Sequence, residues 1–222
     1  MESENPLKRP REEDQPEETA EEETAPYRPP NDGKFDIIYA DPAWDYAGRQ
    51  MHLDTTVTST ALHHYQTVPL NTLKTLDVPS ISAKDCLLFM WTSSPHLEQA
   101  IELMKAWQFE YKTIAFVWDK QKTNPGYYTM SQCEICLVGK KKGGSIPKPR
   151  GARNARQFIS EMRTEHSAKP TEVRNRIELM FPLQRKIELF ARTPTPGWSI
   201  WGNEVVNSVD IPWTGARGGA AV

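Results

Sequence analysis

Short apolar runs recur along the chain from Lys34 onward, each bounded by polar or turn-forming residues. Runs of this length, rich in β-branched and aromatic side chains, predict buried strands. Strands are expected at Lys34–Ala40, Cys86–Thr92, Tyr111–Trp118, Cys133–Gly139, Arg185–Ala191 and Trp198–Gly202.

Two segments between these runs carry apolar residues at helical spacing. In the first, one face holds Leu97, Ala100, Ile101 and Met104. Ser94 is expected to cap this helix and Pro95 to occupy its first position. In the second, within 170–181, one side holds Val173, Ile177 and Met180.

The alternation of strands and helices predicts an α/β fold with a mainly parallel sheet. In such sheets, ligands bind at the carboxyl ends of the strands. Asp41 directly follows the first predicted strand and therefore lies at such an end.

Charge divides the chain into a tail and a single folded domain. Residues 1–30 carry a net charge of −6, against −2 for the whole chain, so the remainder carries +4. The tail has few large apolar residues and cannot offset its ordering entropy. We expect a disordered acidic tail over 1–33, one domain over 34–210 and a flexible C-terminal tail over 211–222.

Several features predict an intracellular protein, in the cytoplasm or the nucleus. The N-terminus has no apolar signal region, and no apolar run approaches the roughly 18 residues of a membrane span. The three cysteines cannot form a closed set of disulfides, which fits a reducing compartment. The basic cluster "LKRPRE" at 7–12 is either a nuclear-import signal or part of a solvated tail.

Common catalytic motifs are missing from the sequence. There is no G-x-G-x-x-G, no P-loop and no serine in a nucleophile elbow. Cys133 and Cys136 form a C-x-x-C without a second pair at zinc spacing, so they are expected to flank or enter a strand. No metal site is predicted.

The tetrapeptide Asp41-Pro42-Ala43-Trp44 has a composition that suits methylation of an exocyclic amine. The amine of adenine is a poor nucleophile, because its lone pair is delocalised into the ring. A carboxylate and a backbone carbonyl that accept its two N–H groups stabilise the positive charge that develops as it attacks a methyl sulfonium. Proline stiffens the backbone, and an aromatic ring offers a flipped base a stacking face. The same four residues also fit a turn that ends a strand, followed by a packed tryptophan.

Further motifs resemble a known family over about Phe35–Val205. They are "YADPAW", "HYQTV", "LLFMWT", "FVWDKQKTNPGYYTMSQCEICLVGKKKG", "RTEHSAKPTEVRNRIE" and "RKIELFARTPTPGWSIWGNE". In order and spacing they resemble the N6-adenine methyltransferases that include the catalytic subunit of the mRNA methylase. The similarity is greatest to the compact phage and prophage members, which lack large added domains.

The resemblance implies a Rossmann-like methyltransferase with helices on both faces of the sheet, the β-class motif order and S-adenosylmethionine as methyl donor. Asp41 and Pro42 would hold the target amine, and Trp44 would stack near it. Lys169 in "SAKP" matches the lysine that meets the cofactor carboxylate. The cofactor ribose would be held by Arg192, Asn203 and Glu204.

The chain departs from the family pattern at three places. Ala43 replaces the second proline of the usual Asp-Pro-Pro-Trp, which predicts a looser loop and slower catalysis. Pro194 and Thr195 stand where the mRNA enzyme has a histidine and an asparagine. The acid that binds the cofactor adenine upstream of the tetrad has no match.

The segment 139–160 contains basic residues and no acid. Glycine and proline interrupt it, so its first half is predicted to be a mobile loop. Either it is a solvated loop, or it binds phosphates beside the methylation site. The candidate nucleic-acid-binding residues are Lys140, Lys141, Lys142, Lys148, Arg150 and Arg153.

Three functions are therefore open. The favoured one is methylation of adenine N6 in DNA, because of the compact phage-type match. The second is methylation of adenosine N6 in RNA. The third is a non-catalytic nucleic-acid-binding subunit, which the retained Asp41 disfavours. We expect a nucleic-acid partner, no membrane partner, and a possible homo- or heterodimer.

Overall fold

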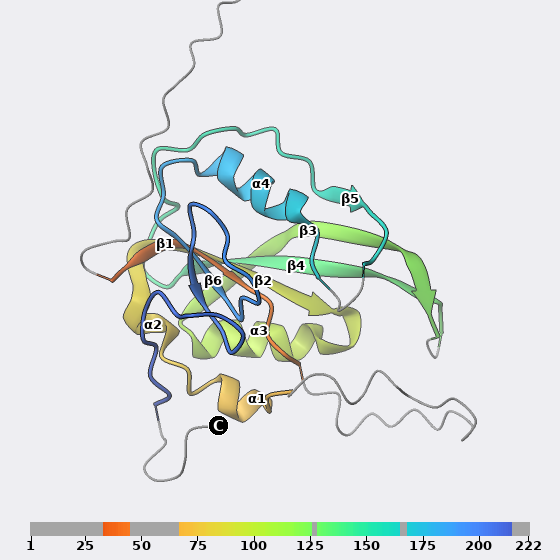
Figure 1. The fold of residues 1–222 in the computed structure, drawn as a ribbon, viewed down its shortest axis with the longest axis horizontal. Coiled ribbons are helices and arrows are strands. Elements are labelled where there is room, and N and C mark those ends of the chain that lie inside the picture. Colours follow the sequence, from red (N-terminus) through yellow and green to blue (C-terminus); the bar gives the residue numbers. More distant parts are fainter. Residues whose placement is uncertain (1–32, 45–66, 126–127, 165–167, 215–222) are drawn as a thin grey trace, which may run out of the picture.

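The computed structural model describes residues 33–44, 67–125, 128–164 and 168–214. Residues 1–32 of the predicted acidic tail, including the basic cluster "LKRPRE", lie outside the described residues. A seven-stranded sheet has the order β5-β3-β4-β2-β1-β6-β7 (Figure 1). Its strands are β1 (Phe35–Ala40), β2 (Ser82–Ser93), β3 (Phe109–Asn124), β4 (Ser131–Lys141), β5 (Phe158–Ser160), β6 (Lys186–Leu189) and β7 (Ser199–Trp201).

The sheet is mainly parallel, as predicted, with one strand reversed. β1 pairs in parallel with β2 and β6, β6 with β7, and β3 with β5. β4 is antiparallel to both of its neighbours, β2 and β3. The chain between β3 and β4 is too short for the crossover that a parallel pair requires, so the two strands form a hairpin.

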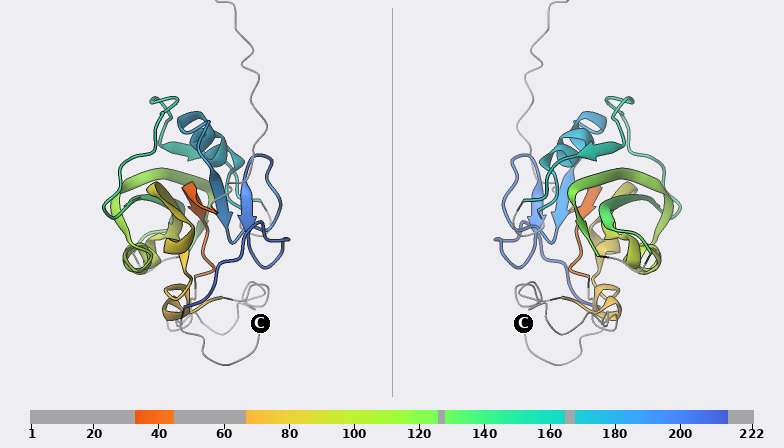
Figure 2. Two further views of the ribbon diagram at one scale, coloured as in Figure 1. Left: turned by 90° about the vertical axis from the view of Figure 1, so that its left-hand side faces the viewer. Right: turned by 90° about the vertical axis from the view of Figure 1, so that its right-hand side faces the viewer.

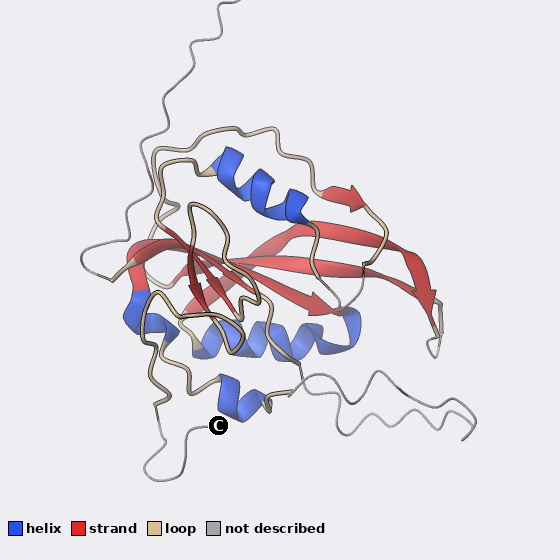
Figure 3. Cartoon of the chain, viewed as in Figure 1, coloured by secondary structure: helices blue, strands red, loops and turns tan. Residues whose placement is uncertain are grey.

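Helices cover both faces of the sheet. Helix α4 (Thr171–Met180) packs on one face and α3 (Leu97–Ala106) on the other (Figures 1 and 3). The short helices α1 (Leu70–Leu73) and α2 (Val78–Ile81), which the sequence did not predict, lie on the side of α3. Side views show β6 and β7 on one side of the sheet and the β3–β4 hairpin toward the other, where β5 is the outermost strand (Figure 2). The predicted Rossmann-like α/β architecture is confirmed.

The apolar run of β1 is continuous because both of its faces are covered. Ile37 and Tyr39 belong to the core beneath α4, together with Val173 and Ile177. Ile38 and Ala40 belong to the core beneath α3, together with Leu103, Met104 and Trp107. The end of β1 is therefore fixed from both sides.

The predicted start of the first helix is wrong. Ser94–His96 forms a 3₁₀ turn, η1, and α3 begins only at Leu97. No side chain caps either element. The Ser93 hydroxyl instead bonds to the His96 ring nitrogen Nδ1, at 2.8 Å.

The fold extends beyond the predicted domain boundary at residue 210. Ile211 is buried, the Pro212 carbonyl accepts a hydrogen bond from Asp77, and Trp213 forms a bridge with Leu76. The segment 211–214 is therefore packed against the domain and is not a tail, whereas 215–222 lies outside the described residues. No helix in the described ranges is long and apolar enough to cross a membrane.

Candidate active site

Asp41 lies where β1 ends, between the carboxyl ends of β2 and β6. Its Oδ2 accepts a hydrogen bond from the Lys169 ammonium at 2.8 Å. Lys169 stands just before α4, so the packing of α4 on the sheet brings together two residues that are 128 positions apart. The structure thus joins the predicted catalytic acid to one of the predicted cofactor-binding residues.

A chain of alternating charges extends from this pair across the sheet. The Lys169 ammonium also lies 3.3 Å from Glu134 Oε2 on β4. The other oxygen of Glu134, Oε1, lies 3.2 Å from the Lys120 ammonium on β3. The side chains of Lys120 and Lys169 are only 6% and 11% exposed. Two lysines and two carboxylates therefore balance one another in a largely desolvated site.

The two carboxylates keep Lys169 charged. Burial alone lowers the pKa of this ammonium, but the charges of Asp41 and Glu134 and their hydrogen bonds outweigh that effect and raise its pKa above 10.5. Next to this group, burial and the charge of Asp41 raise the pKa of the Cys136 thiol well above its usual value. Cys136 is therefore a neutral packing residue and not a nucleophile.

Two backbone hydrogen bonds fix the tetrad. The Trp44 N–H donates to the Pro42 carbonyl at 2.9 Å, and the Val68 N–H donates to the Ala43 carbonyl at the same distance. The first bond sets the direction of the Pro42 carbonyl, which has a second lone pair for a substrate N–H. The second bond ties the backbone at Ala43 to the segment before α1.

The Trp44 side chain is buried, with only 7% of its surface exposed. Its indole Nε1 donates to the Trp91 carbonyl on β2 at 3.1 Å, and its ring stacks on His96. The Trp91 ring lies on the other side of the sheet, where its Nε1 donates to the Tyr39 hydroxyl at 2.6 Å. Trp91 also lies beneath Lys169, whose ammonium is 5.8 Å from the ring centroid.

A second buried ion pair stands beside this network. On β6, both carboxylate oxygens of Glu188 accept from Arg174 Nη1 of α4, at 2.9 and 2.8 Å. Burial raises the pKa of Glu188, with the nearby charge of Asp41 contributing in the same direction. This pair ties α4 to β6 and so helps to hold Lys169 against the end of β1.

Sequence reasoning missed Lys120, Glu134, Arg174 and Glu188. Glu134 and Glu188 lie inside segments that were recognised as strands and family motifs, "CEICLVG" and "RKIELFA". A charged residue within an otherwise apolar strand is a usable signal, because burying a charge is costly unless it is paired. Which residue pairs with such a buried charge depends on strand register and helix packing, and the spacing of residues along the sequence does not reveal either.

The other predicted cofactor residues follow the next two strands. Arg192 comes after β6, and Asn203 and Glu204 come after β7, so all three share the carboxyl edge with Asp41. Gly202 permits this arrangement, because a Cβ there would lie 2.2 Å from the Ala191 carbonyl oxygen. Asn203 and Glu204 are exposed in a turn that is closed by a 2.8 Å bond from the Gly202 N–H to Asn207.

The predicted basic loop begins at the amino ends of β1 and β2, opposite the carboxyl ends where Asp41 lies. Lys140 and Lys141 belong to β4, where Lys140 pairs with Leu87 near the amino end of β1. Lys140 bonds to the Gly144 carbonyl, and the Lys141 ammonium lies 5.5 Å from the centroid of the Phe109 ring. Lys140 and Lys141 therefore lie in a strand and not in the predicted mobile loop, and the antiparallel course of β4 along β2 places them at the opposite end of the strands from Asp41. That these lysines bind nucleic acid stays a prediction.

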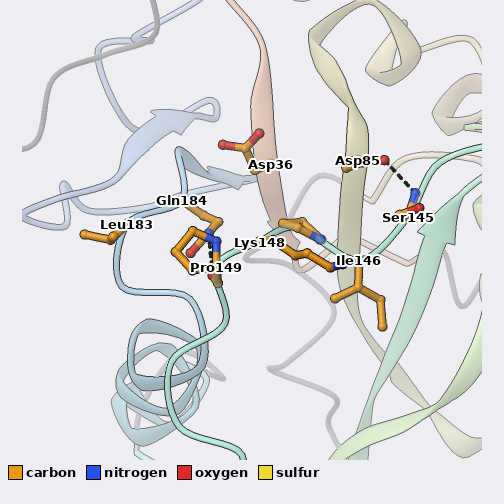
Figure 4. A pocket seen from close by; sticks show the side chains of 9 residues that line it. Asp36, Asp85, Ser145, Ile146, Lys148, Pro149, Leu183 and Gln184 are labelled. Atoms are coloured by element: carbon orange, nitrogen blue, oxygen red, sulfur yellow. Dashed lines mark hydrogen bonds between the residues drawn. The ribbon is translucent and has the colours of Figure 1, made fainter.

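A pocket of about 380 Å³ also lies at this amino edge (Figure 4). Lys148 and Pro149 contribute to it, together with Asp36 and Asp85 from the starts of β1 and β2. Asp36 is separated from Asp41 by the length of β1, roughly 16 Å at strand spacing. The pocket is thus separate from the carboxyl-edge site.

Of the remaining predicted bases, Arg150 packs over the Phe181 ring and Arg153 is exposed.

Within the described ranges, no group of three histidine, cysteine or acidic side chains could hold a metal ion. Cys133 and Cys136 both lie on β4, in agreement with the prediction that they enter a strand. Both thiols are free, as is that of Cys86.

Comparison with known proteins gives consistent matches over this domain. The MT-A70 family profile matches residues 35–204. The chain is 49% identical over 195 residues to the type II methyltransferase M.MunI of Mycoplasma sp, covering 82% of this chain and 83% of that protein. It is 29% identical to the N(6)-adenosine-methyltransferase MT-A70-like protein of Arabidopsis thaliana and 28% identical to the human N(6)-adenosine-methyltransferase catalytic subunit METTL3. These matches cover 83% and 78% of this chain but only 26% and 28% of the relatives.

Proposed function

Because the chain belongs to the MT-A70 family, we propose that it transfers a methyl group from S-adenosylmethionine to the N6 amine of adenine in DNA. The observation that carries this proposal is the Asp41–Lys169 pair at the carboxyl end of β1, beside a Pro42 carbonyl of fixed direction. These groups supply the two hydrogen-bond acceptors that an exocyclic amine requires. The RNA reaction and a non-catalytic role are the alternatives that the assays below separate.

The residues of the site have separable roles. Asp41 accepts one N–H of the target amine, and the Pro42 carbonyl accepts the other. Lys169 occupies Oδ2 of Asp41, which leaves the other carboxylate oxygen for the substrate. As positive charge develops on the amine, the fixed carboxylate stabilises it without having to reorganise. Glu134 and Lys120 hold Lys169 in place.

The charge pattern of the site fits the proposed cofactor. The methionine end of S-adenosylmethionine carries both a carboxylate and an ammonium group, and the site contains a buried ammonium between two carboxylates. We assign Lys169 to the cofactor carboxylate. Glu204 is an exposed carboxylate that can accept hydrogen bonds from two ribose hydroxyls, beside Asn203 and Arg192. When bound, the cofactor supplies an electrophilic methyl group on a sulfonium.

DNA is proposed over RNA because of the extent of the matches. The match to the type II methyltransferase M.MunI covers 83% of that protein, whereas the matches to the N(6)-adenosine-methyltransferases of Arabidopsis thaliana and human cover only 26% and 28% of theirs. In duplex DNA the target adenine must leave the base stack, which costs a few kcal/mol. Single-stranded or mismatched sites should therefore react faster than matched duplexes.

The test is transfer of a labelled methyl group to matched duplex DNA, single-stranded DNA and RNA oligonucleotides, followed by identification of the modified base. N6-methyladenine in DNA, formed by the wild-type protein and lost in Asp41→Ala, is the expected result. Methylation of RNA with none of DNA would support the second function. Binding of nucleic acid without transfer to any of the three would support the third.

A further inference from the structure

The Trp44 side chain makes its hydrogen bond and its ring contact with one segment of chain, the end of β2 and η1. Its indole Nε1–H donates to the Trp91 carbonyl near the end of β2, at 3.1 Å. Its ring lies nearly parallel to that of His96 in η1, with ring centroids 5.9 Å apart and planes inclined by 16°. Since η1 directly follows β2, both contacts tie the chain after β1 to the chain at the end of β2.

His96 is itself held in a fixed orientation. The side chain is buried, with 3% of its surface exposed, and its Nδ1 shares a 2.8 Å hydrogen bond with the Ser93 hydroxyl. This bond restrains the plane of the imidazole and therefore the plane of the indole that stacks on it. A flexible aliphatic side chain would not impose such a plane.

Trp44 has too little exposed surface to receive a base. A tryptophan side chain buries at most about 250 Å², and an exposed fraction of 7% corresponds to roughly 18 Å² of that. Stacking requires one full ring face, and the His96 ring lies against the indole. The polar edge is also in use, because Nε1–H is bonded to Trp91.

We infer that Trp44 is a positioning residue for the tetrad and that His96 is a second one acting through it. The last ladder pair between β1 and β2 is Ala40 with Met90, so Asp41 and Pro42 lie beyond the sheet. Trp44 anchors the far end of this short unpaired stretch. The backbone N–H of Trp44 sets the direction of the Pro42 carbonyl, and stacking on His96 restrains the plane of the Trp44 ring. Stacking on the target base falls to other side chains.

This inference rests on the proposed adenine methylation, and two kinds of measurement keep the two apart. The first is the single-turnover rate of methyl transfer, together with the Kd for an adenine-containing oligonucleotide. The second is hydrogen exchange at the Trp44 indole N–H by NMR, which needs no activity. The variants are Trp44→Ala, His96→Ala, His96→Phe and Ser93→Ala, with Leu97→Ala as a matched control in the adjoining turn.

His96→Ala should slow methyl transfer about ten- to a hundred-fold, because small displacements of reacting groups cost this much. The Kd for the oligonucleotide should stay within about twofold. His96→Phe keeps a flat ring and should recover most of the rate. The rate of Ser93→Ala should lie between that of His96→Ala and that of the wild type. Exchange of the Trp44 indole N–H should accelerate in His96→Ala. Leu97→Ala should lower the melting temperature while the folded enzyme keeps its rate.

Two results would overturn the inference. The first is a His96→Ala protein with both the wild-type rate and wild-type exchange at Trp44. The second is a Trp44→Ala protein whose Kd for the oligonucleotide rises more than its rate falls, because that pattern indicates base stacking. A wild-type protein that methylates no adenine would instead refute the proposed function, and the exchange measurement would still decide the role of His96.

Discussion

The two edges of the sheet both carry charged side chains but arrange them differently. At the carboxyl edge, Asp41, Lys169, Glu134 and Lys120 come from four separate parts of the chain and pair with one another in series. At the amino edge, the contacts are a direct ion pair and bonds to backbone carbonyls. Asp36 accepts three hydrogen bonds from Arg185, while Lys140 and Lys141 reach backbone carbonyls.

This difference indicates that the contacts at the amino edge stabilise the fold, whereas those at the carboxyl edge form a site. The ion pair of Asp36 with Arg185 and the lysine bonds to carbonyls close the ends of strands. A series of buried charges requires mutual compensation, because desolvating each charge is costly. A dense run of bases in the sequence was therefore a poorer guide to the site than isolated charges within strands.

Removal of the Asp41 carboxylate should give the largest effect. Asp41→Asn keeps a hydrogen-bond acceptor but loses the charge, and loss of one preorganised partner typically costs about a hundred- to a thousand-fold in rate. Asp41→Ala should be slower still, with cofactor affinity and melting temperature changed much less. A folded Asp41→Ala protein that methylates adenine at nearly the wild-type rate would refute the assignment of the carboxyl edge as the active site.

Cofactor affinity should depend on Lys169 and Glu204. Charge-assisted hydrogen bonds contribute roughly 1.5–3 kcal/mol each, so Lys169→Ala and Glu204→Ala should each weaken S-adenosylmethionine binding about ten- to a hundred-fold in calorimetry. Arg185→Ala at the amino edge is the matched control, since it breaks an ion pair far from the site. Unchanged affinity in both carboxyl-edge variants would mean that the cofactor binds elsewhere.

Alkaline pH should reduce the stability that the ion pairs of Lys169 at the carboxyl edge contribute to the fold. The folded-state pKa of Lys169 is raised above its ordinary 10.5, so the stability gained from its ion pairs is present below that pH and is lost as pH rises through the folded pKa. The difference in free energy of unfolding between the wild type and Lys169→Met should therefore shrink above about pH 10.5 in urea titrations. A difference that stays constant from pH 8 to pH 11.5 would show that the charge of Lys169 is not what stabilises this edge.

The smallest effect is expected at the lysines that the sequence marked most clearly. Lys140 and Lys141 bond to backbone carbonyls at the edge opposite Asp41, so their joint replacement by glutamine should leave the salt dependence of DNA affinity unchanged. Adding Lys142→Gln tests the exposed member of the triplet. If the slope of log DNA affinity against log salt concentration flattens in proportion to the charges removed, the prediction that this segment binds phosphates would be restored.

The α/β class, the position of Asp41 at the end of a strand and the family could all be predicted from the amino-acid sequence. These features depend on local periodicity and on motifs that remain contiguous in the chain. The cap predicted at Ser94 was wrong because a tight 3₁₀ turn and a bond between Ser93 and His96 competed with it. Tertiary structure decided which charges meet, because the pairing of Lys169 with Asp41 and Glu134 depends on the packing of α4 and on the reversal of β4. It also buried Trp44 and placed Lys140 and Lys141 at the far edge, because β4 runs antiparallel to β2 and carries the chain from the carboxyl edge at Glu134 to the amino edge at Lys140.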